Sequence, residues 1–351
     1  MPPAISFSQG NVASVIRSFS FVALALASIA CAAADKPRAG TPRELRPEVK
    51  EFVEITARDF SLDARELEKL LAQAETRQSI LDAISKPAER VTPWHEYRER
   101  FMTDKRITQG TEFWSANARQ LTAIEDEGIA AAVAGIIGVE TSYGRITGRY
   151  RVIDALYTLA FDFPARAAFF RSELQQFVLL TKEEAIDPKA ALGSYAGAMG
   201  IPQFIASSYR NFAVDGDGDG RRNLWSNWAD VVSSVANYLR IHGWRSGEPV
   251  VTDATLEGSD MSRFDTSTIA LNETVGSLRE KGVTFASTLP PQAPAMLIVL
   301  QGKDGPVYRV GFNNFFVITR YNRSVMYANA VNDLGQAVLG SAVGPGAQAR
   351  R

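Results

Sequence analysis

The chain has 351 residues, of which 46% are hydrophobic and 22% are charged, and its formal net charge is −1. This is the composition of an ordinary globular protein with about two domains. The near-neutral charge, without a Lys/Arg-rich run, gives no sign of a nucleic-acid-binding surface. The two histidines, His95 and His242, lie far apart in the sequence. This spacing argues against a His-ligated hydrolytic metal and against a Ser-His-Asp triad.

The N-terminal segment predicts export. Arg17 precedes the apolar run FVALALASIA at residues 21–30, and small residues follow. About ten apolar residues are far fewer than the ~20 that a membrane-spanning helix needs. A basic residue, a short apolar run and small residues are instead the pattern of a secretory signal. We therefore predict a signal peptide over residues 1–34.

The only cysteine, Cys31, lies in the predicted cleavage region. The sequence SIAC resembles a bacterial lipobox, with Ser28 where Leu is usual, so one alternative is lipidation of Cys31. The other is ordinary cleavage after Ala32 or Ala34. In either case the mature chain has no disulfide, and its stability must come from its core.

Residues 35–47 contain three prolines among charged residues and predict a flexible tether. Helical patterns begin at Glu48. In DARELEKLLAQA, Asp63 and Glu66 have the spacing of a capping box before an apolar face. The other segments that we expect to be helical are 111–128, 151–161, 164–185 and 227–241.

The pattern changes after Pro249. In AMLIVLQGKDGPVYRVGF, residues 295–312, two β-rich runs are joined by GKDG, which is a hairpin signature. Residues 315–321 either extend this β-rich part or lead back into helix. The Gly/Ala-rich residues 336–351 predict a flexible tail. The expected fold is mainly α (α+β), with a small β insertion at about 250–317.

Glu140 ends an apolar stretch that starts at Ile129. A carboxylate in such surroundings is costly to ionise, so its pKa should rise or it should gain partners. The alternative is a helix end at which Glu140 turns out to solvent. The stretch alone does not decide between the two.

Residues 193–204, GSYAGAMGIPQF, combine three glycines with polar side chains, among them Ser194 and Gln203. Glycines permit close backbone approach, and the polar groups offer hydrogen bonds in that space. A flexible Gly-rich turn is the alternative, but it does not account for the polar groups.

The segment DGDGDGRRNLW, residues 215–225, begins like an EF-hand loop. Its position 12 is Ser226 rather than Glu, so the bidentate acid must come from elsewhere, and Asp230 is nearest. An acidic turn without metal is the alternative. We favour calcium, because adjacent carboxylates without a cation would repel one another. The predicted ligands are Asp215, Asp217, Asp219, the carbonyl of Arg221, and Asp230.

Together these stretches resemble one family, the membrane-bound lytic murein transglycosylases of type B. The resemblance covers about residues 48–335 and rests on six ordered motifs. They are GIIGVETSYG (135–144), FPARAAFF (163–170), SYAGAMGIPQF (194–204), DGDGDGRRNLW (215–225), SVANYLRIHGW (234–244) and NFFVITRYNRS (314–324).

The resemblance implies a lysozyme-like helical catalytic core, an additional helical domain and a small β-rich part. It implies that Glu140 is the catalytic acid and that an EF-hand-like calcium loop lies at 215–230. The implied substrate-binding residues are Arg166, Ser194, Gln203, Tyr238 and Asn322. The sequence departs from the family pattern at Ala165, where an Arg often stands, and at Ala206, where a Pro is common.

The implied reaction cleaves the β-1,4 bond between N-acetylmuramic acid and N-acetylglucosamine and leaves a 1,6-anhydromuramic acid end. Ordinary glycosidases use two carboxylates, whereas here Glu140 would serve as acid and then as base. The implied partners are peptidoglycan glycan strands, an outer-membrane lipid anchor through Cys31, and murein-synthesis or remodelling proteins. The implied location is the periplasm, and no organic cofactor is expected. A hydrolytic muramidase and a non-catalytic murein-binding scaffold remain alternatives.

Overall fold

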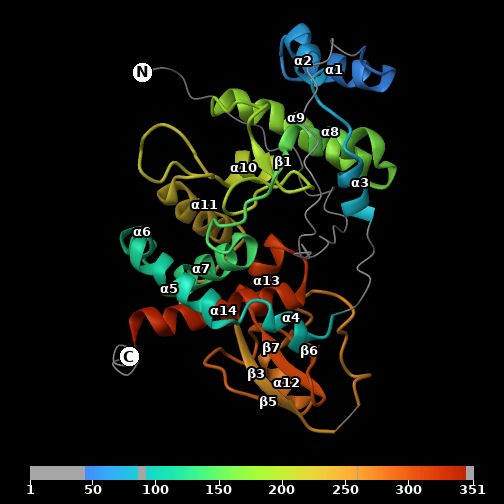
Figure 1. Cartoon of the computed structure of the whole chain (residues 1–351). Coiled ribbons are helices and arrows are strands. Elements are labelled where there is room, and N and C mark those ends of the chain that lie inside the picture. Colours follow the sequence, from blue (N-terminus) through green and yellow to red (C-terminus); the bar gives the residue numbers. More distant parts are fainter. Residues whose placement is uncertain (1–43, 86–91, 259, 345–351) are drawn as a thin grey trace, which may run out of the picture.

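The computed structural model describes residues 44–85, 92–258 and 260–344 (Figure 1). The predicted signal peptide, Cys31 and most of the predicted tether lie outside the described residues. Within these ranges, no helix has the length and apolar character needed to cross a membrane.

One half of the molecule is helical and lies at the end of Figure 1 away from the sheet. There α1 packs on α2, α3 packs on α8, and α8 packs on α9. Arg46, just before α1, binds Asp162 at the end of α8, with 2.6 Å between Nη1 and Oδ1. The elements are α1 (Pro47–Asp59), α2 (Ala64–Leu71), α3 (Gln78–Ser85), α8 (Val152–Asp162), η1 (Pro164–Arg166) and α9 (Ala167–Glu183).

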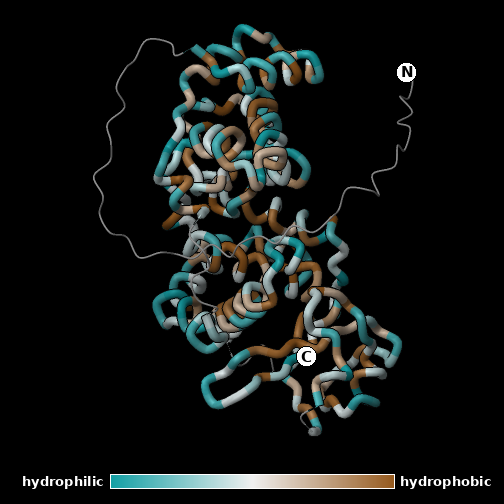
Figure 2. Tube along the Cα trace, turned by 90° about the vertical axis from the view of Figure 1, so that its right-hand side faces the viewer, coloured by the Kyte–Doolittle hydropathy of each residue, from teal (hydrophilic) through white to brown (hydrophobic). Residues whose placement is uncertain are grey.

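The central part is built around α7 and α14, which pack closely on one another. Figure 2 shows hydrophobic segments concentrated inside the helical parts and hydrophilic segments on their outer loops. The elements are α4 (Trp94–Glu99), α5 (Asp104–Ala116), α6 (Ala118–Thr122), α7 (Glu127–Thr141), β1 (Tyr150–Arg151), β2 (Leu192–Gly193), α10 (Ala206–Phe212), α11 (Trp228–Ile241), α13 (Asn313–Tyr321) and α14 (Val325–Val343).

Helix α7 is apolar on all sides and is buried over nearly its whole length. Asp126 caps its start by accepting a hydrogen bond from the Ile129 backbone N–H at 2.9 Å. Small residues allow α14 to cross it closely. A Cβ on Gly135 would overlap the Val331 carbonyl, and a Cβ on Gly335 would overlap the Ala131 carbonyl. The two helices therefore meet backbone to backbone.

The sheet is antiparallel, with strand order β4-β6-β7-β3-β5. One face of β6, with Met296, Ile298 and Leu300, joins the main helical core. The other face, with Leu297, lies in a second core that includes residues of α12. The elements are β3 (Val251–Leu256), β4 (Glu273–Thr274), α12 (Val275–Glu280), β5 (Val283–Phe285), β6 (Pro294–Gln301) and β7 (Pro306–Gly311).

The expected mainly α, α+β architecture is confirmed. The predicted hairpin at 295–312 is the antiparallel pair β6–β7, and residues 315–321 lead back into helix as part of α13. Asp63 caps α2 as expected, since its side chain accepts from the Arg65 and Glu66 backbone N–H groups.

Two expectations need correction. The segment 111–128 is not one helix but is divided at Asn117, whose side chain donates to the Phe113 carbonyl. The flexible tail predicted from residue 336 begins too early, because α14 continues to Val343. The apolar residues Val338 and Leu339 of this segment are buried in the core.

Candidate active site

Glu140 is the penultimate residue of α7, and the chain turns sharply after it. Ser142 and Tyr143 both have left-handed backbone conformations, with φ of 53° and 59°, which are costly for residues other than glycine. Thr141 holds this turn: its hydroxyl donates to the Ile201 carbonyl at 2.9 Å and accepts from the Gly144 N–H at 3.0 Å. The end of α7 is thereby attached to the Gly-rich segment.

The Glu140 carboxylate accepts a hydrogen bond from the Tyr327 hydroxyl, with 2.7 Å between oxygen atoms. Burial raises the pKa of Glu140 to about 7, and the Tyr327 hydrogen bond partly offsets this rise. Near neutral pH such a carboxyl exchanges its proton readily, so it can both donate and accept one. The prediction that Glu140 has a perturbed environment is therefore supported by its geometry and its pKa.

Two further tyrosines lie near Glu140. Burial, reinforced by the charge of Glu140, raises the pKa of Tyr97 to about 12. Burial, and to a smaller extent the charge of Glu140, also raises the pKa of Tyr321 well above its ordinary value. The Tyr321 hydroxyl donates to the Pro202 carbonyl at 2.6 Å. Tyrosines from α4, α13 and α14 thus surround the carboxylate as neutral groups.

A cavity of about 70 Å³ brings two of the predicted binding residues, Gln203 and Tyr238, together with Tyr321. Tyr238 donates to the Arg320 carbonyl at 2.7 Å and stacks on His242, with 4.0 Å between ring centroids. The cavity is lined by Gln203, Phe204, Ile205, Ser208, Tyr238, Arg320 and Tyr321.

Ser194 and Gln203 both stabilise the Gly-rich segment. The Ser194 hydroxyl oxygen accepts from the N–H groups of Ala196 and Ala198, at 3.3 and 3.0 Å. Gln203 has a left-handed φ of 54°, and its Nε2 donates to the carbonyls of Thr147 and Gly200, at 3.0 and 2.9 Å. The segment is thus a fixed backbone surface rather than a flexible turn.

The remaining two predicted binding residues differ from each other. Asn322 follows Tyr321 directly, and its Oδ1 is buried without a hydrogen-bond partner among the described residues. A buried acceptor without a partner is costly unless a ligand or water satisfies it, so this atom is suited to receive a substrate N–H or O–H. Arg166 instead lies in η1, where its guanidinium stacks on Phe169 and Phe170 at 4.5 and 5.1 Å from the ring centroids.

The acidic loop brings together Asp215, Asp217 and Asp230, each with an oxygen within 4.8 Å of the others. Asp230 is fully buried at the start of α11, and its carboxylate accepts from the N–H groups of Gly216 and Asn223, at 2.8 and 2.6 Å. Burial raises the pKa of Asp230, and the negative charges of Asp217 and Asp215 contribute to the rise. Converging oxygen donors that repel one another fit a hard divalent cation.

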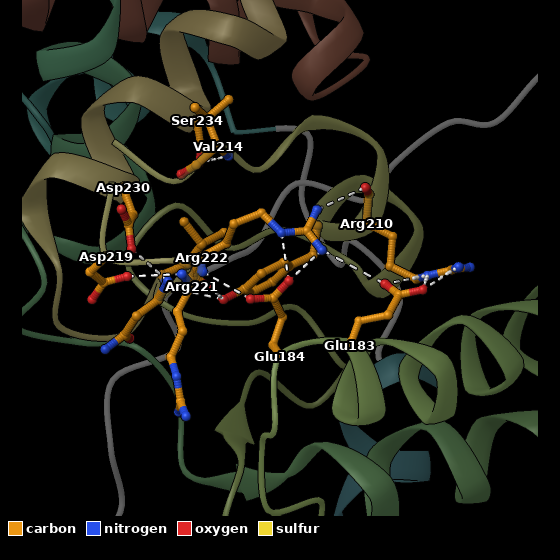
Figure 3. A network of polar contacts seen from close by, with 12 residues as sticks. Glu183, Glu184, Arg210, Val214, Asp219, Arg221, Arg222, Asp230 and Ser234 are labelled. Atoms are coloured by element: carbon orange, nitrogen blue, oxygen red, sulfur yellow. Dashed lines mark hydrogen bonds and ion pairs between the residues drawn. The ribbon is translucent and has the colours of Figure 1, made fainter. Parts of the chain in front are cut away.

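Asp219 is not a member of this group of three. Its carboxylate accepts from the Arg221 N–H at 2.9 Å, which turns the chain toward Arg222. Figure 3 shows this part of the loop. The Arg222 Nε donates to Glu184 at 2.6 Å, and the Arg222 N–H donates to the same carboxylate at 2.8 Å. Glu184 follows α9 directly, so the acidic loop is fixed to the end of that helix.

Sequence reasoning missed the tyrosines around Glu140. Tyr321 lies within the motif RYN, but the segment containing it and Tyr327 reads as an ordinary Tyr-rich core segment. Tyr97 lies 43 positions before Glu140 in a stretch without a distinctive pattern. Nothing in the local pattern could have placed Tyr327 on Glu140, because the two residues are 187 positions apart.

Comparison with known proteins identifies the family of the chain. The sequence profile described as Transglycosylase SLT domain matches residues 44–336. The membrane-bound lytic murein transglycosylase B of Escherichia coli (strain K12) is 37% identical over 308 residues, covering 83% of this chain and 82% of that protein.

Solved structures are similar over most of the chain. The soluble lytic transglycosylase SltB1 of Pseudomonas aeruginosa superposes with a TM-score of 0.81 at 45% identity, covering 85% of this chain and 100% of that one. The E. coli lytic transglycosylase Slt35 in complex with calcium superposes with a TM-score of 0.76 at 36% identity, covering 85% of this chain and 94% of that one. P. aeruginosa SltB3 in complex with NAG-NAM-pentapeptide superposes with a TM-score of 0.73 at 30% identity, covering 85% of this chain and 80% of that one. The chain therefore belongs to the family of transglycosylase SLT domains, enzymes that cleave the glycosidic bonds of peptidoglycan.

Proposed function

We propose that this enzyme cleaves the β-1,4 bond between N-acetylmuramic acid and N-acetylglucosamine with Glu140 as its single catalytic carboxylate. The observation that carries the proposal is the pKa of Glu140, raised to about 7 by burial and held by Tyr327. Of the described residues, no second carboxylate contributes to this pKa. A glycosidase that works with two carboxylates would need one close by, at about 5–10 Å.

The reaction follows in two proton transfers. Protonated Glu140 donates its proton to the glycosidic oxygen, and the bond from that oxygen to the anomeric carbon breaks. The muramyl acetamide oxygen stabilises the electron-poor carbon. The Glu140 carboxylate then accepts the proton of the C6 hydroxyl, whose oxygen bonds to the anomeric carbon and closes the 1,6-anhydro ring. Glu140 ends with its proton restored.

The tyrosines make Glu140 suitable for both transfers. Tyr327 donates to the carboxylate and so stabilises the ionised form after the first transfer. Burial favours the protonated form of Glu140 before the first transfer. The two influences oppose each other, and together they leave the pKa close to ambient pH, where a group that acts first as acid and then as base is most effective.

We assign substrate binding to the five predicted residues. Gln203 and Tyr238 line the cavity beside Tyr321, and Asn322 offers an Oδ1 that has no hydrogen-bond partner in the part of the chain that the structure describes. Ser194 fixes the Gly-rich backbone on which a sugar would lie. Arg166 presents a cation stacked on aromatic rings in η1. SltB3, which binds a glycan carrying a pentapeptide, supports peptidoglycan strands as the partner.

We assign a structural calcium ion to the acidic loop. Asp215, Asp217 and Asp230 would hold it, with Asp219 and the Arg221 carbonyl as the further predicted ligands. Slt35 has been solved in complex with calcium. The ion would neutralise the converging carboxylates and stiffen the loop, and neither proton transfer requires it. We expect no organic cofactor.

We place the mature enzyme in the periplasm. The E. coli relative is named as membrane-bound, which supports a lipid anchor at Cys31 without deciding it for this chain. Metabolic labelling with palmitate tests the anchor: label on the wild type and none on Cys31→Ala is expected for a lipoprotein. An unlabelled wild type would contradict the lipid anchor and favour ordinary cleavage after Ala32 or Ala34. Association with murein-synthesis or remodelling proteins remains part of the same proposal.

Mass spectrometry of the products released from purified sacculi tests the reaction. We expect ends of 1,6-anhydromuramic acid, about 18 Da lighter than reducing ends, because the C6 hydroxyl replaces water as nucleophile. Reducing ends would mean a hydrolytic muramidase. Glu140→Gln should lose about 10³-fold or more in turnover, since acid-base catalysis is worth 10²–10⁴-fold. A folded Glu140→Gln variant with substantial activity would place the acid elsewhere.

A further inference from the structure

A side chain of the sheet reaches the helix that carries Tyr327. Arg309 lies on β7, and only 13% of its side chain is exposed. Its Nη1 donates to the side-chain oxygens of Asn329 and Asp333, at 2.8 Å in both cases. Both acceptors lie on α14, within two turns after Tyr327. Strand β7 is thereby attached to the N-terminal half of α14.

The contact with Asn329 extends into the first turn of α14. Asn329 is completely buried, and its Nδ2 donates to the Val325 carbonyl at 2.8 Å. Tyr327 lies between these two residues. Its backbone N–H donates to the Ser324 hydroxyl, which caps the helix, at 3.2 Å. The turn that carries Tyr327 is therefore held at its start by the cap and from the sheet side by Arg309.

Asp333 joins a third element to this arrangement. It accepts from the Arg98 Nε at 2.8 Å, and Arg98 lies on α4. The guanidinium of Arg309 also stacks on Trp94, at the start of the same helix, 5.7 Å from the ring centroid. Figure 1 shows α4 next to the strands and to α14, and α4 contacts both α14 and β6. The sheet is thus fixed to two helices, α4 and α14, that carry tyrosines of the active site.

We propose that Arg309 is a positioning residue for the catalytic acid: through Asn329 and Asp333 it fixes the first turn of α14, and with it the Tyr327 hydroxyl on Glu140. The proposal rests on the proposed role of Glu140. It gives the small sheet a part in catalysis although Arg309 does not touch the carboxylate.

Several titratable or charged groups face Glu140. Tyr97 comes from α4, Tyr321 from α13 and Tyr327 from α14. Arg106, from α5, does not contribute to the pKa of Glu140 and donates instead to the Gly138 carbonyl, two residues earlier on α7. Of these groups, Tyr327 donates a hydrogen bond to the carboxylate. Loosening the first turn of α14 should therefore act on Glu140 through Tyr327.

The test measures turnover of purified sacculi against pH for the enzyme and for Arg309→Met. Methionine keeps the apolar stem, and Asp333 keeps Arg98 as its cation, so the variant leaves no buried carboxylate unpaired. We expect turnover to fall about 5-fold and the alkaline limb of the pH profile to move upward by about half a pH unit. Both effects follow because the hydrogen bond from Tyr327, which favours the ionised form of Glu140, is weakened.

Two further variants separate positioning from a direct effect of charge. If the charges acted directly on Glu140, loss of the positive charge in Arg309→Met would raise its pKa and move the alkaline limb of the pH profile upward. Loss of the negative charge in Asp333→Asn would lower that pKa and move the alkaline limb downward. Positioning predicts an upward shift for both. In a Tyr327→Phe background, Arg309→Met should change turnover less than about 2-fold, because residues acting through one contact are not additive.

Arg77→Met is the matched control. Arg77 binds the buried Asp154 at 3.4 Å, and Asp154 keeps Arg151 at 3.6 Å as its second cation. This cluster joins the residue directly before α3 to β1 and α8, which lie away from the sheet (Figure 1), so we expect a lower melting temperature and an unchanged pH profile. Should Arg309→Met fail to fold, Asn329→Ala removes the link to the first turn and should shift the limb in the same direction.

An Arg309→Met variant that only melts earlier, with the wild-type pH profile and an undiminished effect in the Tyr327→Phe background, would overturn the proposal. Opposite shifts in Arg309→Met and Asp333→Asn would do so as well. Neither outcome bears on the role of Glu140, which Glu140→Gln tests separately.

Discussion

Gly135 on α7 and Val331 on α14 meet so closely that a single added carbon on Gly135 would overlap the Val331 carbonyl. This crossing lies between two parts of the active site. Glu140 is five residues after Gly135 on one helix, and Tyr327 is four residues before Val331 on the other. The distance from carboxylate to hydroxyl therefore depends on two helices packed backbone to backbone.

Gly135→Ala should destabilise the fold by about 1–3 kcal/mol, the usual cost of overpacking a dense core. It should also reduce turnover, because α14 must move to admit the methyl group. Thermal unfolding and sacculus digestion measure the two effects. Gly128→Ala, in the first turn of α7, is the control: the nearest atoms are ends of side chains at 3.2 Å, so both effects should be smaller. Equal losses in the two variants would contradict the importance of the crossing.

Glu140→Gln should change the pH dependence of stability. The folded-state pKa of Glu140 is about 7, against an ordinary value of 4.5. Between these values the folded state holds a proton that the unfolded state has lost, so wild-type stability falls as pH rises through this window. Each pKa unit is worth about 1.4 kcal/mol, so the window is worth about 3 kcal/mol at most.

Glutamine is neutral throughout, so Glu140→Gln should match the wild type near pH 4 and exceed it near pH 8. Urea unfolding at several pH values measures this difference. A constant difference across the range would mean that Glu140 ionises normally.

Tyr327→Phe should move the alkaline limb of the pH profile upward by about one unit and lower turnover about 10-fold. Glu140 must hold a proton to act as acid, so activity is lost as pH rises through its pKa, about 7 in the wild type. The phenol hydrogen bond stabilises the charged form, and a bond to a charged group is worth about tenfold or more. Phenylalanine removes that bond alone. An unchanged profile would show that the hydroxyl does not act on the carboxylate during turnover.

Calcium should raise the melting temperature, and Asp215→Ala or Asp230→Ala should abolish the rise. A ligand at 100 times its dissociation constant stabilises by about 2.7 kcal/mol, and titration should extend through 10⁻⁴–10⁻³ M, the range of extracellular calcium modules. Asp260→Ala, outside the loop, should retain the response. A chelated enzyme that stays folded but has lost all turnover would contradict a purely structural role.

Local sequence patterns predict those features of the structure that are formed by residues close together in the chain. GKDG between two β-rich runs indicates the hairpin β6–β7. An acid at the end of an apolar run fits a perturbed carboxylate and a solvent-facing helix end equally well, so only the resemblance to the family singles out Glu140. The Asp-Gly alternation likewise indicates the acidic loop, although it does not show that Asp219 lies outside the group formed by Asp215, Asp217 and Asp230. That exclusion depends on the position of α11, which no local pattern encodes.

The C-terminal segment shows why the rest could not be predicted. Its Gly and Ala content is typical of a flexible tail, yet α14 extends to Val343. Small residues can also permit a close helix crossing, as Gly335, directly before this segment, does against Ala131. Small side chains favour disorder in isolation and tight packing next to a suitable partner. The partner, α7, lies about 200 positions earlier in the chain.

The hydrogen bond between Tyr327 and Glu140 joins positions 187 apart, and that between Thr141 and Ile201 joins positions 60 apart. Until both segments have folded together, Glu140 is an ordinary solvated carboxyl group with the acidity of any other glutamate. An unfolded chain would therefore carry no catalyst, and wall-cleaving activity would arise only once both pairs of segments have come together in the completed fold.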